Sequence, residues 1–399
     1  MPLPPSLWLY LASRFCAASA MTMLQTAVIW HVVALSNSPF QVGLLGVVQF
    51  APALLLMLLG GAVADTFDRR SVVMLAQLPP LAAGAVLYFA TVRGLVGVPL
   101  IFAAMSLIAA AGAFDGPARM AFLPGLVGKD AFPRAVVFAS TTMAMAFVTG
   151  PGLQGLLIAE SGVHTVYALY VGLIGLALVF LSFLHPVAPA AAGGAMSMEA
   201  VREGLGFVRR SPVILGCMTL DMFAVIFGGA SALLPFYAKD ILGKGPRGYG
   251  VLAASLEMGA LLMGLFMLTR PPVVRAGRAL LIAVGVYGAA TIAFGLSRIF
   301  PLSVAFYMTA GMADCVSVIM RSTAIQLSTP DELRGRVSAV NMLFIGASNR
   351  LGQAESGFVA ALTSATFSVV SGGVGCLVVL AIVAARIPEL RRYRIPSRS

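Results

Sequence analysis

The residues of this sequence that are best suited to chemistry are charged side chains inside long apolar stretches. A charge within a lipid bilayer is expensive, so each one is a candidate to bind a proton, an ion or a polar substrate. Ion pairs that only hold helices together are the alternative for each of them. The set consists of Arg14, Asp115, Arg119, Asp221, Glu257, Asp314, Arg321, Arg350 and Glu355.

Two pairs in this set have helical spacing. Asp115 and Arg119 are four residues apart, and Asp314 and Arg321 are seven apart, so each pair lies on one face of a helix. Ion pairs that close a cytoplasmic gate and contacts to a substrate both agree with this spacing. Glu257 has no opposite charge near it in the sequence. It is therefore a candidate proton carrier, and a hydrogen-bonded core carboxyl is the alternative.

Polar residues form a stripe along the predicted helix 336–362. Asn341, Ser348, Gly352 and Glu355 fall on one side of that helix, which we expect to face a cavity. The candidates for substrate binding or proton coupling are therefore Arg14, Asp221, Glu257, Asp314, Asn341, Arg350 and Glu355.

Membrane-spanning helices must position these residues. Of the 399 residues, 59% are hydrophobic and 10% are charged, whereas soluble proteins carry about 25% charged residues. This composition excludes a soluble globule. The net charge of +11 does not indicate nucleic-acid binding, because the Arg residues lie in loops between apolar spans.

The chain contains twelve apolar runs that are long enough to span a bilayer, for which about 20 residues suffice. Loops rich in Arg alternate with loops that hold few, and this places both termini in the cytoplasm. The runs cover residues 7–34, 41–64, 71–92, 98–121, 134–160, 164–185, 213–236, 248–269, 278–296, 301–327, 336–362 and 366–386.

The two halves of the chain repeat one another. The run from Gly43 to Leu55 matches the run from Gly250 to Leu262 at an offset of 207 residues. Duplicated halves are typical of secondary transporters. We therefore divide the chain into a first six-helix half (1–185), a linker (186–212), a second six-helix half (213–386) and a basic cytoplasmic tail (387–399). Within the linker, Met198–Arg210 has apolar residues on one face, which predicts an interfacial amphipathic helix.

The same offset maps Arg14 onto Asp221, so opposite charges occupy equivalent positions in the two halves. Neither residue has an opposite charge three or four residues away on its own helix. We hypothesise that the two charges attract each other across a cavity in one conformation and separate in another. The alternative is that each side chain extends to the cytoplasmic surface.

The loop after the second span, from Gly60 to Arg70, holds four charges at the membrane surface. Asp65 and Arg69 are four residues apart and can pair, so the loop predicts a latch between conformations. A basic loop that only sets topology is the alternative. The residues that we assign to the latch or to gating are Asp65, Asp68, Arg69, Arg70, Asp115, Arg119, Arg321, Arg334 and Arg336.

The fifth span contains Gly150, Pro151 and Gly152, followed by Gly155. Proline removes a backbone donor and glycine removes side-chain bulk, so we expect a kinked helix that packs closely on a neighbour. Flexible apolar side chains are expected to line the cavity, because they suit amphipathic molecules. They are Phe15, Met21, Met23, Phe114, Met222, Phe223 and Met312.

Several of these segments resemble the major facilitator superfamily. The loop from Gly60 to Arg70 is similar to its signature G-x-x-x-D-R-x-G-R-R, although Thr66 and Asp68 depart from it. The segment at Gly150 resembles the G-P-x-x-G signature of proton-driven exporters. Four further segments resemble the branch of this superfamily that contains the enterobactin exporter and macrolide efflux pumps. They are residues 221–230, 321–323, 329–337 and 348–349.

The resemblance implies an all-α membrane protein with 12 transmembrane helices in two pseudo-symmetric six-helix halves, in the bacterial inner membrane. It implies an exporter of siderophores, macrolides or other amphipathic compounds that works by alternating access and is driven by proton entry. An importer of the same fold and a non-transporting receptor or scaffold are the alternatives. The expected partners are a small-molecule substrate, protons and the lipid bilayer, with no nucleic acid, and the protein is expected to be a monomer.

The sequence does not predict an enzyme or a cofactor site. It contains neither H-E-x-x-H nor G-x-S-x-G. Its cysteines stand singly in apolar spans, where they are expected to be small buried hydrophobes rather than metal ligands. Its histidines lie near span ends, where we expect them to be solvated or at the membrane interface. These residues are Cys16, Cys217, Cys315 and Cys376, and His31, His164 and His185.

Overall fold

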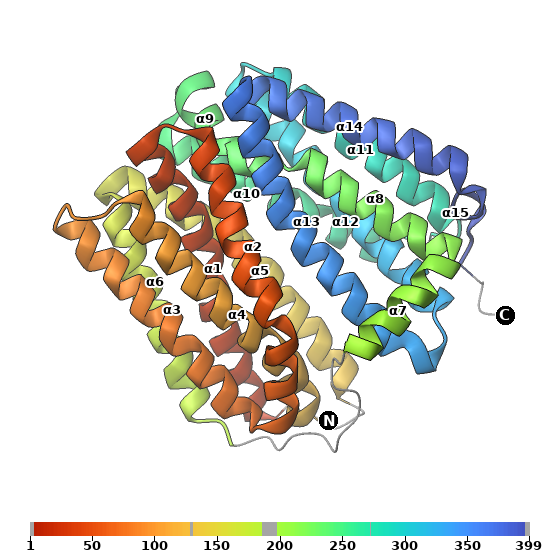
Figure 1. The fold of residues 1–399 in the computed structure, drawn as a ribbon, viewed down its shortest axis with the longest axis horizontal. Helices are drawn as coiled ribbons and strands as arrows, with labels where there is room; N and C mark the ends of the chain where they lie inside the picture. Colours follow the sequence, from red (N-terminus) through yellow and green to blue (C-terminus); the bar gives the residue numbers. More distant parts are fainter. Residues whose placement is uncertain (1–3, 128–130, 186–197, 272, 396–399) are drawn as a thin grey trace. The chain divides into compact units, whose positions relative to one another are not determined.

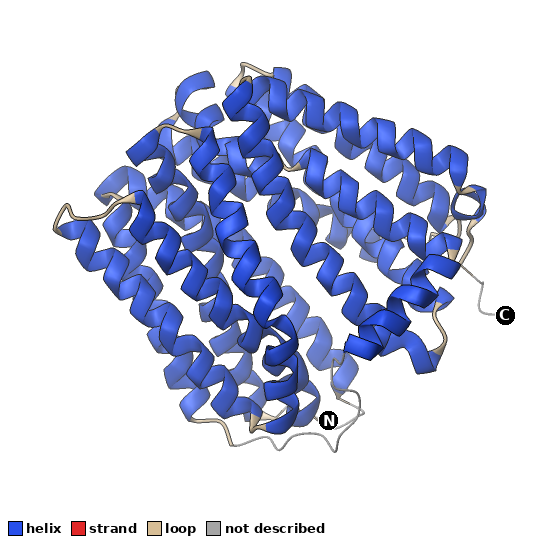
Figure 2. Ribbon diagram, in the orientation of Figure 1, coloured by secondary structure: helices blue, strands red, loops and turns tan. Residues whose placement is uncertain are grey.

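A computed structural model of the protein describes residues 4–127, 131–185, 198–271 and 273–395. Within these ranges every regular element is a helix, so the predicted all-α class is confirmed (Figure 2). Apolar runs favour helices in a membrane protein because a helix satisfies its own backbone hydrogen bonds, which a bilayer cannot do.

The first part of the chain, red to yellow-green in Figure 1, forms six long helices. Proline lies in the first turn of α1 and α4 (Pro5 and Pro99), where its missing N–H has no helical partner to lose. Asn37 ends α1 in the left-handed conformation, with φ of 50°. The helices are α1 (Pro5–Ser36), α2 (Pro39–Thr66), α3 (Arg69–Val92), α4 (Val98–Leu126), α5 (Phe132–Ser161) and α6 (Val163–Ser182).

The second part of the chain, green to blue in Figure 1, begins with a short helix and continues with long ones. They are α7 (Met198–Arg210), α8 (Pro212–Gly228), η1 (Ala230–Leu233), α9 (Leu234–Phe236), η2 (Tyr237–Ile241), α10 (Gly245–Leu268), α11 (Ala276–Leu296), α12 (Phe300–Ser328), η3 (Asp331–Leu333), α13 (Arg334–Leu362), α14 (Ala365–Arg386) and α15 (Pro388–Arg392).

The seventh predicted span, 213–236, is not one continuous helix. The helix α8 ends at Gly228, and Gly229 leaves the helical region with φ −71° and ψ 60°. A 3₁₀ turn, a short α-helix and a π turn follow it. Two consecutive glycines and the nearby Pro235 lower the stability of a continuous helix here.

Eleven helices of the described ranges are long and apolar enough to cross a membrane. The eleventh predicted span, 336–362, coincides with α13, which is helical over 29 residues but is absent from this group. Its sequence includes Arg334, Arg336, Arg350 and Glu355, and these charges lower its hydropathy. A helix with such a polar side needs protein or water beside it rather than lipid.

The chain divides into two compact units. The first contains Met1–Asn37, Val47–Ala195 and Gly245–Ala254, and the second contains Ser38–Gly46, Met196–Lys244 and Ser255–Ser399. The predicted boundaries at 185 and 213 therefore differ from these units in two places. The first turns of α2 belong to the second unit, and the first turns of α10 belong to the first unit.

In the first unit α1 packs on α5 and α6, and α3 packs on α4 and α6. Lipid gives helices little hydrophobic reason to associate, so close packing must hold them together. Tyr10 of α1 stacks on Phe122 of α4, with ring centroids 5.3 Å apart. Gly84 of α3 lies against the ring of Tyr170 of α6, where a Cβ would not fit. A ring stack and a ring packed on a glycine therefore contribute to the packing of these helices.

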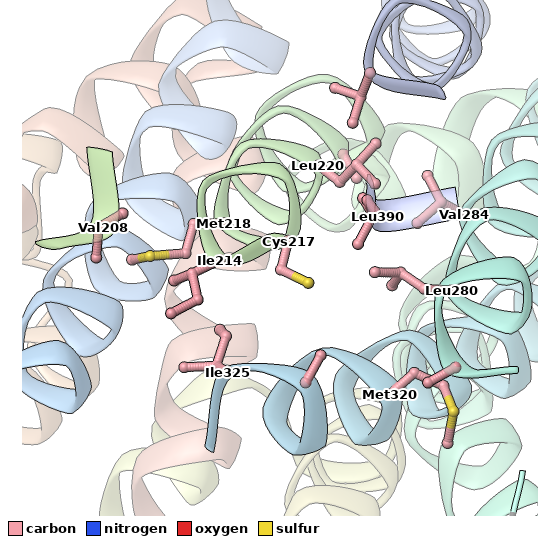
Figure 3. Close-up of a cluster of buried hydrophobic side chains, with 14 of the residues drawn as sticks. Val208, Ile214, Cys217, Met218, Leu220, Leu280, Val284, Met320, Ile325 and Leu390 are labelled. Carbon is pink, nitrogen blue, oxygen red and sulfur yellow. The ribbon is translucent and has the colours of Figure 1, made fainter. Parts of the chain in front are cut away.

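In the second unit α11 packs on α12 and α14, and α8 packs on α13 and α14. One apolar cluster joins several of these helices. Cys217 of α8, Leu280 of α11, Ile325 of α12 and Leu390 of α15 all point into it (Figure 3). Cys16, Cys217 and Cys376 are buried, as expected of small hydrophobes, whereas Cys315 is half-buried.

The amphipathic helix predicted for Met198–Arg210 is present as α7. It packs on α13 and α8, with Val208 fully buried. The side chains of Met198 and Val201 lie outside the described residues, as does the linker segment 186–197. The predicted basic tail also has structure, because α15 buries Leu390 against the second unit.

Candidate functional site

The loop between α2 and α3 carries the predicted latch. The side chain of Asp65 lies outside the described residues, so its pairing with Arg69 stays a prediction. Arg69 itself is buried. Asp68 accepts hydrogen bonds from the backbone N–H of Ser71 at 2.9 Å and from its hydroxyl at 2.7 Å. Asp68 thereby caps the first turn of α3.

Arg70 holds the end of α6. Its guanidinium donates to the carbonyl oxygens of Leu181 at 3.1 Å and Ser182 at 2.7 Å. The last carbonyls of a helix have no helical partner and carry the negative end of its dipole, so a cation there is stabilising. Arg70 thus joins the start of α3 to the end of α6 within the first unit.

A polar network in the first unit contains the first buried ion pair. The Nε of Arg119 lies 2.7 Å from Oδ2 of Asp115, and the two side chains are 9% and 19% exposed. Gln77 of α3 donates to the same carboxylate at 3.0 Å. Tyr10 of α1 donates to the carbonyl oxygen of Arg119 and accepts from Arg14. The network therefore links α1, α3 and α4, and Arg14 is one of its members.

The second unit contains a buried ion pair of its own. Arg321 of α12 pairs with Asp221 of α8, and the side chains are 5% and 10% exposed. Arg321 therefore pairs with a residue of another helix and not with Asp314, which the sequence spacing had favoured. Asp221 and Arg14 each have a partner within their own unit, so their burial does not require mutual attraction. Their pairing in another conformation stays a hypothesis.

Two carboxyl groups in the second unit have no cation beside them. Glu257 of α10 and Asp314 of α12 are both half-buried. They are close enough for their charges to interact. Within the described part of the chain, neither carboxyl forms an ion pair or a hydrogen bond.

The backbones of α10 and α12 touch at the place that holds these carboxyls. A Cβ on Gly311 would lie 3.0 Å from the Cα of Leu256, the residue before Glu257. A Cβ on Gly259 would lie 3.1 Å from the backbone nitrogen of Met312. Glycine at both positions allows this close approach. It brings Glu257 and Asp314 to within about one turn of the crossing point.

The residues of the polar stripe predicted for α13 are buried or half-buried, and the cavity that they were expected to face stays a prediction. Ser348 and Gly352 are buried and Asn341 and Arg350 are half-buried. Glu355 accepts a hydrogen bond from Ser356 at 3.3 Å. A cavity of about 290 Å³ lies beside α13, but it is apolar and shares only Ser348 with the stripe. Its lining residues are Leu205, Met222, Val340, Leu343, Phe344, Ala347, Ser348 and Leu351.

Of the flexible side chains expected to line a cavity, Met222 does so. Met23 does not, because it is fully buried in the first unit. Phe223 stacks on Phe227 of the same helix, with centroids 5.9 Å apart. An apolar surface in this cavity suits an amphipathic or apolar ligand.

The glycines of the fifth span pack backbone against backbone. Gly150 of α5 meets α1, where a Cβ would lie 2.9 Å from the carbonyl oxygen of Ser19. Gly155 meets the first turns of α10, where a Cβ would lie 2.6 Å from the Cα of Gly250. Gly43 of α2 is the repeat equivalent of Gly250, and it belongs to the second unit. A Cβ on Gly43 would lie 3.2 Å from the Cα of Gly357 in α13. The two repeat positions therefore make the same kind of contact.

The remaining predicted gate residues lie at the surface. Arg334 pairs with Asp331 at 2.6 Å, and Arg336 pairs with Glu203 of α7 at 2.6 Å. Both pairs are largely exposed, so each contributes little to stability. The second pair ties the linker helix to the start of α13.

Sequence reasoning missed three buried polar residues. Gln77 contacts Asp115, as described above. His31 was expected to be solvated or at the membrane interface, but it is buried, and its Nδ1 lies 2.8 Å from the hydroxyl of Tyr167. Gln154 of α5 is fully buried, and neither atom of its amide has a hydrogen-bond partner in the described ranges. Gln154 could have been found by its place between Pro151 and Gly155.

An all-helical chain with many membrane spans and charged groups inside them defines a multi-pass membrane protein of the transporter class. The chain belongs to the MFS_3 family, described as transmembrane secretion effector, whose model matches residues 6–398. The predicted membership of the major facilitator superfamily is thus confirmed, and so is the prediction that the protein is a transporter and not an enzyme.

Curated relatives cover nearly the whole chain. Enterobactin exporter EntS of Escherichia coli O1:K1 / APEC is 25% identical over 390 residues, which cover 96% of this chain and 92% of the relative. Enterobactin exporter EntS of Citrobacter koseri is 25% identical over 392 residues, with the same coverage.

Solved structures of transporters share the fold. A bacterial homologue of the human lysosomal transporter Spinster, in an inward-facing and unoccupied conformation, has a TM-score of 0.73, is 16% identical and covers 99% of this chain and 100% of its own. A POT family transporter in complex with 5-aminolevulinic acid has a TM-score of 0.76, is 11% identical and covers 97% of each chain. At these identities the likeness shows the fold alone.

Proposed function

We propose that this protein is a secondary active exporter that exchanges protons for amphipathic small molecules by alternating access. The observation that carries the proton coupling is the pair of carboxyl groups of Glu257 and Asp314, neither of which forms an ion pair within the described ranges. Carboxyl groups that are removed from water inside a membrane protein and lie near one another are suited to take up and release protons.

The crossing of α10 and α12 explains how a proton could be linked to movement. Because Gly259 and Gly311 bring the two backbones into contact, a change of charge at Glu257 or Asp314 acts directly on the packing of the helices. A packed interface has discrete arrangements rather than a continuous range, so a local change of charge can select between two of them. Proton uptake would favour one arrangement and proton release the other.

The proposed architecture has twelve spans in two halves of six, with α13 as a polar eleventh span beside the eleven apolar ones. A span that lines an aqueous path is expected to be less apolar than one that faces lipid. The Arg-rich loops place both termini in the cytoplasm of a bacterium, with the protein in the inner membrane. We propose that Asp115 with Arg119, and Asp221 with Arg321, belong to gates whose helices shift between conformations.

The substrate class follows from the cavity and the relatives. The 290 Å³ cavity is apolar, with Met222 and Phe344 in its lining. Methionine and aromatic side chains adapt to apolar ligands of different shape. The relatives are named as exporters of enterobactin. We propose a siderophore, a macrolide or another drug-like amphipathic compound, transported by a monomer, with no role for nucleic acid.

Transport into everted membrane vesicles tests the proposal. Vesicles that contain the protein receive an inward-acid pH gradient and a labelled siderophore or macrolide. Export from the cell predicts substrate uptake that collapses when the gradient is dissipated. An importer of the same fold predicts substrate loss from preloaded vesicles, and a receptor or scaffold predicts no gradient-dependent movement in either direction.

A further inference from the structure

We infer that a basic pocket in the second unit binds the phosphate group of an anionic membrane lipid. The start of α11 and the segment around α15 form its walls, and its volume is about 250 Å³. This inference does not depend on the proposed transport function. The lining residues are Arg275, Arg278, Arg391, Arg392, Tyr393 and Arg394.

The backbone holds the two walls of this pocket together. The N–H of Ile395 donates to the carbonyl oxygen of Val274 at 2.9 Å, and the N–H of Gly277 donates to that of Tyr393 at 3.3 Å. Gly277 also lies against the carbonyl of Leu390, at a place where a Cβ would collide. The arginines therefore project from a fixed frame, and a site that is already formed loses less entropy on binding.

The five arginines have no acidic partner in the described ranges. No ion pair involves them, and Glu389 of α15 is exposed and pairs with none of them. Five like charges around one small space repel one another unless an anion lies between them. The planar guanidinium group binds phosphate oxygens in a two-point geometry, so phosphate is the anion that these residues suit best.

The neighbouring helix surfaces indicate that a lipid supplies the phosphate. Arg278, Ile282 and Val286 are spaced by four residues on α11, so they lie on one face, and all three are exposed. Ile282 is 67% exposed and Val286 is 41% exposed. The adjacent α14 likewise exposes Ile382, at 53%. A headgroup in the pocket would therefore place its acyl chains along an apolar surface, as basic pockets at the cytoplasmic face do for anionic lipids.

Native mass spectrometry of the full-length protein, titrated with phosphatidylglycerol, cardiolipin or phosphatidylcholine, tests this site. The pocket variant carries Arg278→Gln, Arg391→Gln and Arg394→Gln. The control variant carries three changes to Gln on α7, at Arg202, Arg209 and Arg210, and has the same net charge. A basic residue near a membrane surface changes lipid affinity about fivefold. We expect the pocket variant to bind the anionic lipids about 100-fold more weakly and the control to bind them normally.

Two results would overturn the inference. Equal loss in both variants would mean that the lipids follow net charge and not this pocket. If the pocket variant binds the anionic lipids normally but no longer binds millimolar inorganic phosphate, a soluble phosphate and not a lipid occupies the site. A thermal unfolding curve for each variant checks its folding, and Arg278→Lys, which keeps the charge but loses the two-point geometry, should give an intermediate loss of affinity.

Discussion

Breaking the buried ion pair of Asp221 and Arg321 should destabilise the protein strongly. The side chain of Asp221 is 10% exposed and that of Arg321 is 5% exposed, so water cannot compensate a charge that loses its partner. Asp221→Leu or Arg321→Met alone should each lower the free energy of unfolding by about 3–5 kcal/mol. The double variant removes both charges and should be close to the wild type, which corresponds to a coupling energy of about 6–10 kcal/mol.

The measurement is an unfolding titration of the four proteins in mixed micelles, followed by circular dichroism. The exposed pair of Glu160 and Arg247, at 60% and 62%, is the matched control. Removing either partner of that pair should cost about 1 kcal/mol or less. A coupling energy near zero for Asp221 and Arg321 would refute the reasoning.

Transport by the same double variant separates two roles of the ion pair. If the pair only holds α8 to α12, the refolded double variant should transport substrate normally. If the pair belongs to a gate, the double variant should be stable and inactive.

Three further predictions concern single residues. Glu257→Gln should keep the shape of the side chain but remove its titration, so vesicles should no longer accumulate substrate in response to a pH gradient. Gly250→Val should abolish transport, because its Cβ would lie 2.6 Å from the Cα of Gly155 and force α10 away from α5. Gln154→Leu should raise the free energy of unfolding by about 1–3 kcal/mol, since it removes a fully buried amide without hydrogen bonds.

Controls are available for each of these variants. Glu160→Gln, at an exposed carboxyl, should leave gradient-driven uptake unchanged, and normal uptake by Glu257→Gln would assign proton coupling to another group. Gly152→Ala adds a Cβ with only one neighbour, at 4.0 Å, and should be active. An active Gly250→Val would show that the crossing does not limit transport. A less stable Gln154→Leu would show that the amide has a partner in the membrane-embedded protein.

Sequence alone was enough to predict the local features of this protein. The apolar runs located the long helices, and the apolar face of Met198–Arg210 located α7. Both patterns depend on residues that are close together in the chain. The spacing of Asp115 and Arg119 predicted their contact for the same reason. The break of α8 at Gly228 was missed, although the two glycines and Pro235 were visible, because an apolar composition does not show where a helix ends.

Only the tertiary structure decided which helices face one another, and with them the partners of the buried charges. Arg321 and Asp314 are seven residues apart on one face of the same helix, and this spacing favoured them as partners. The packing of α8 against α12 instead makes Asp221 the partner of Arg321. Gln77 reaches Asp115 because α3 lies against α4, and the C-terminal arginines converge on α11 because Gly277 admits the chain beside it. A contact between helices depends on the position and rotation of both, and glycines far apart in the sequence set how closely those helices approach.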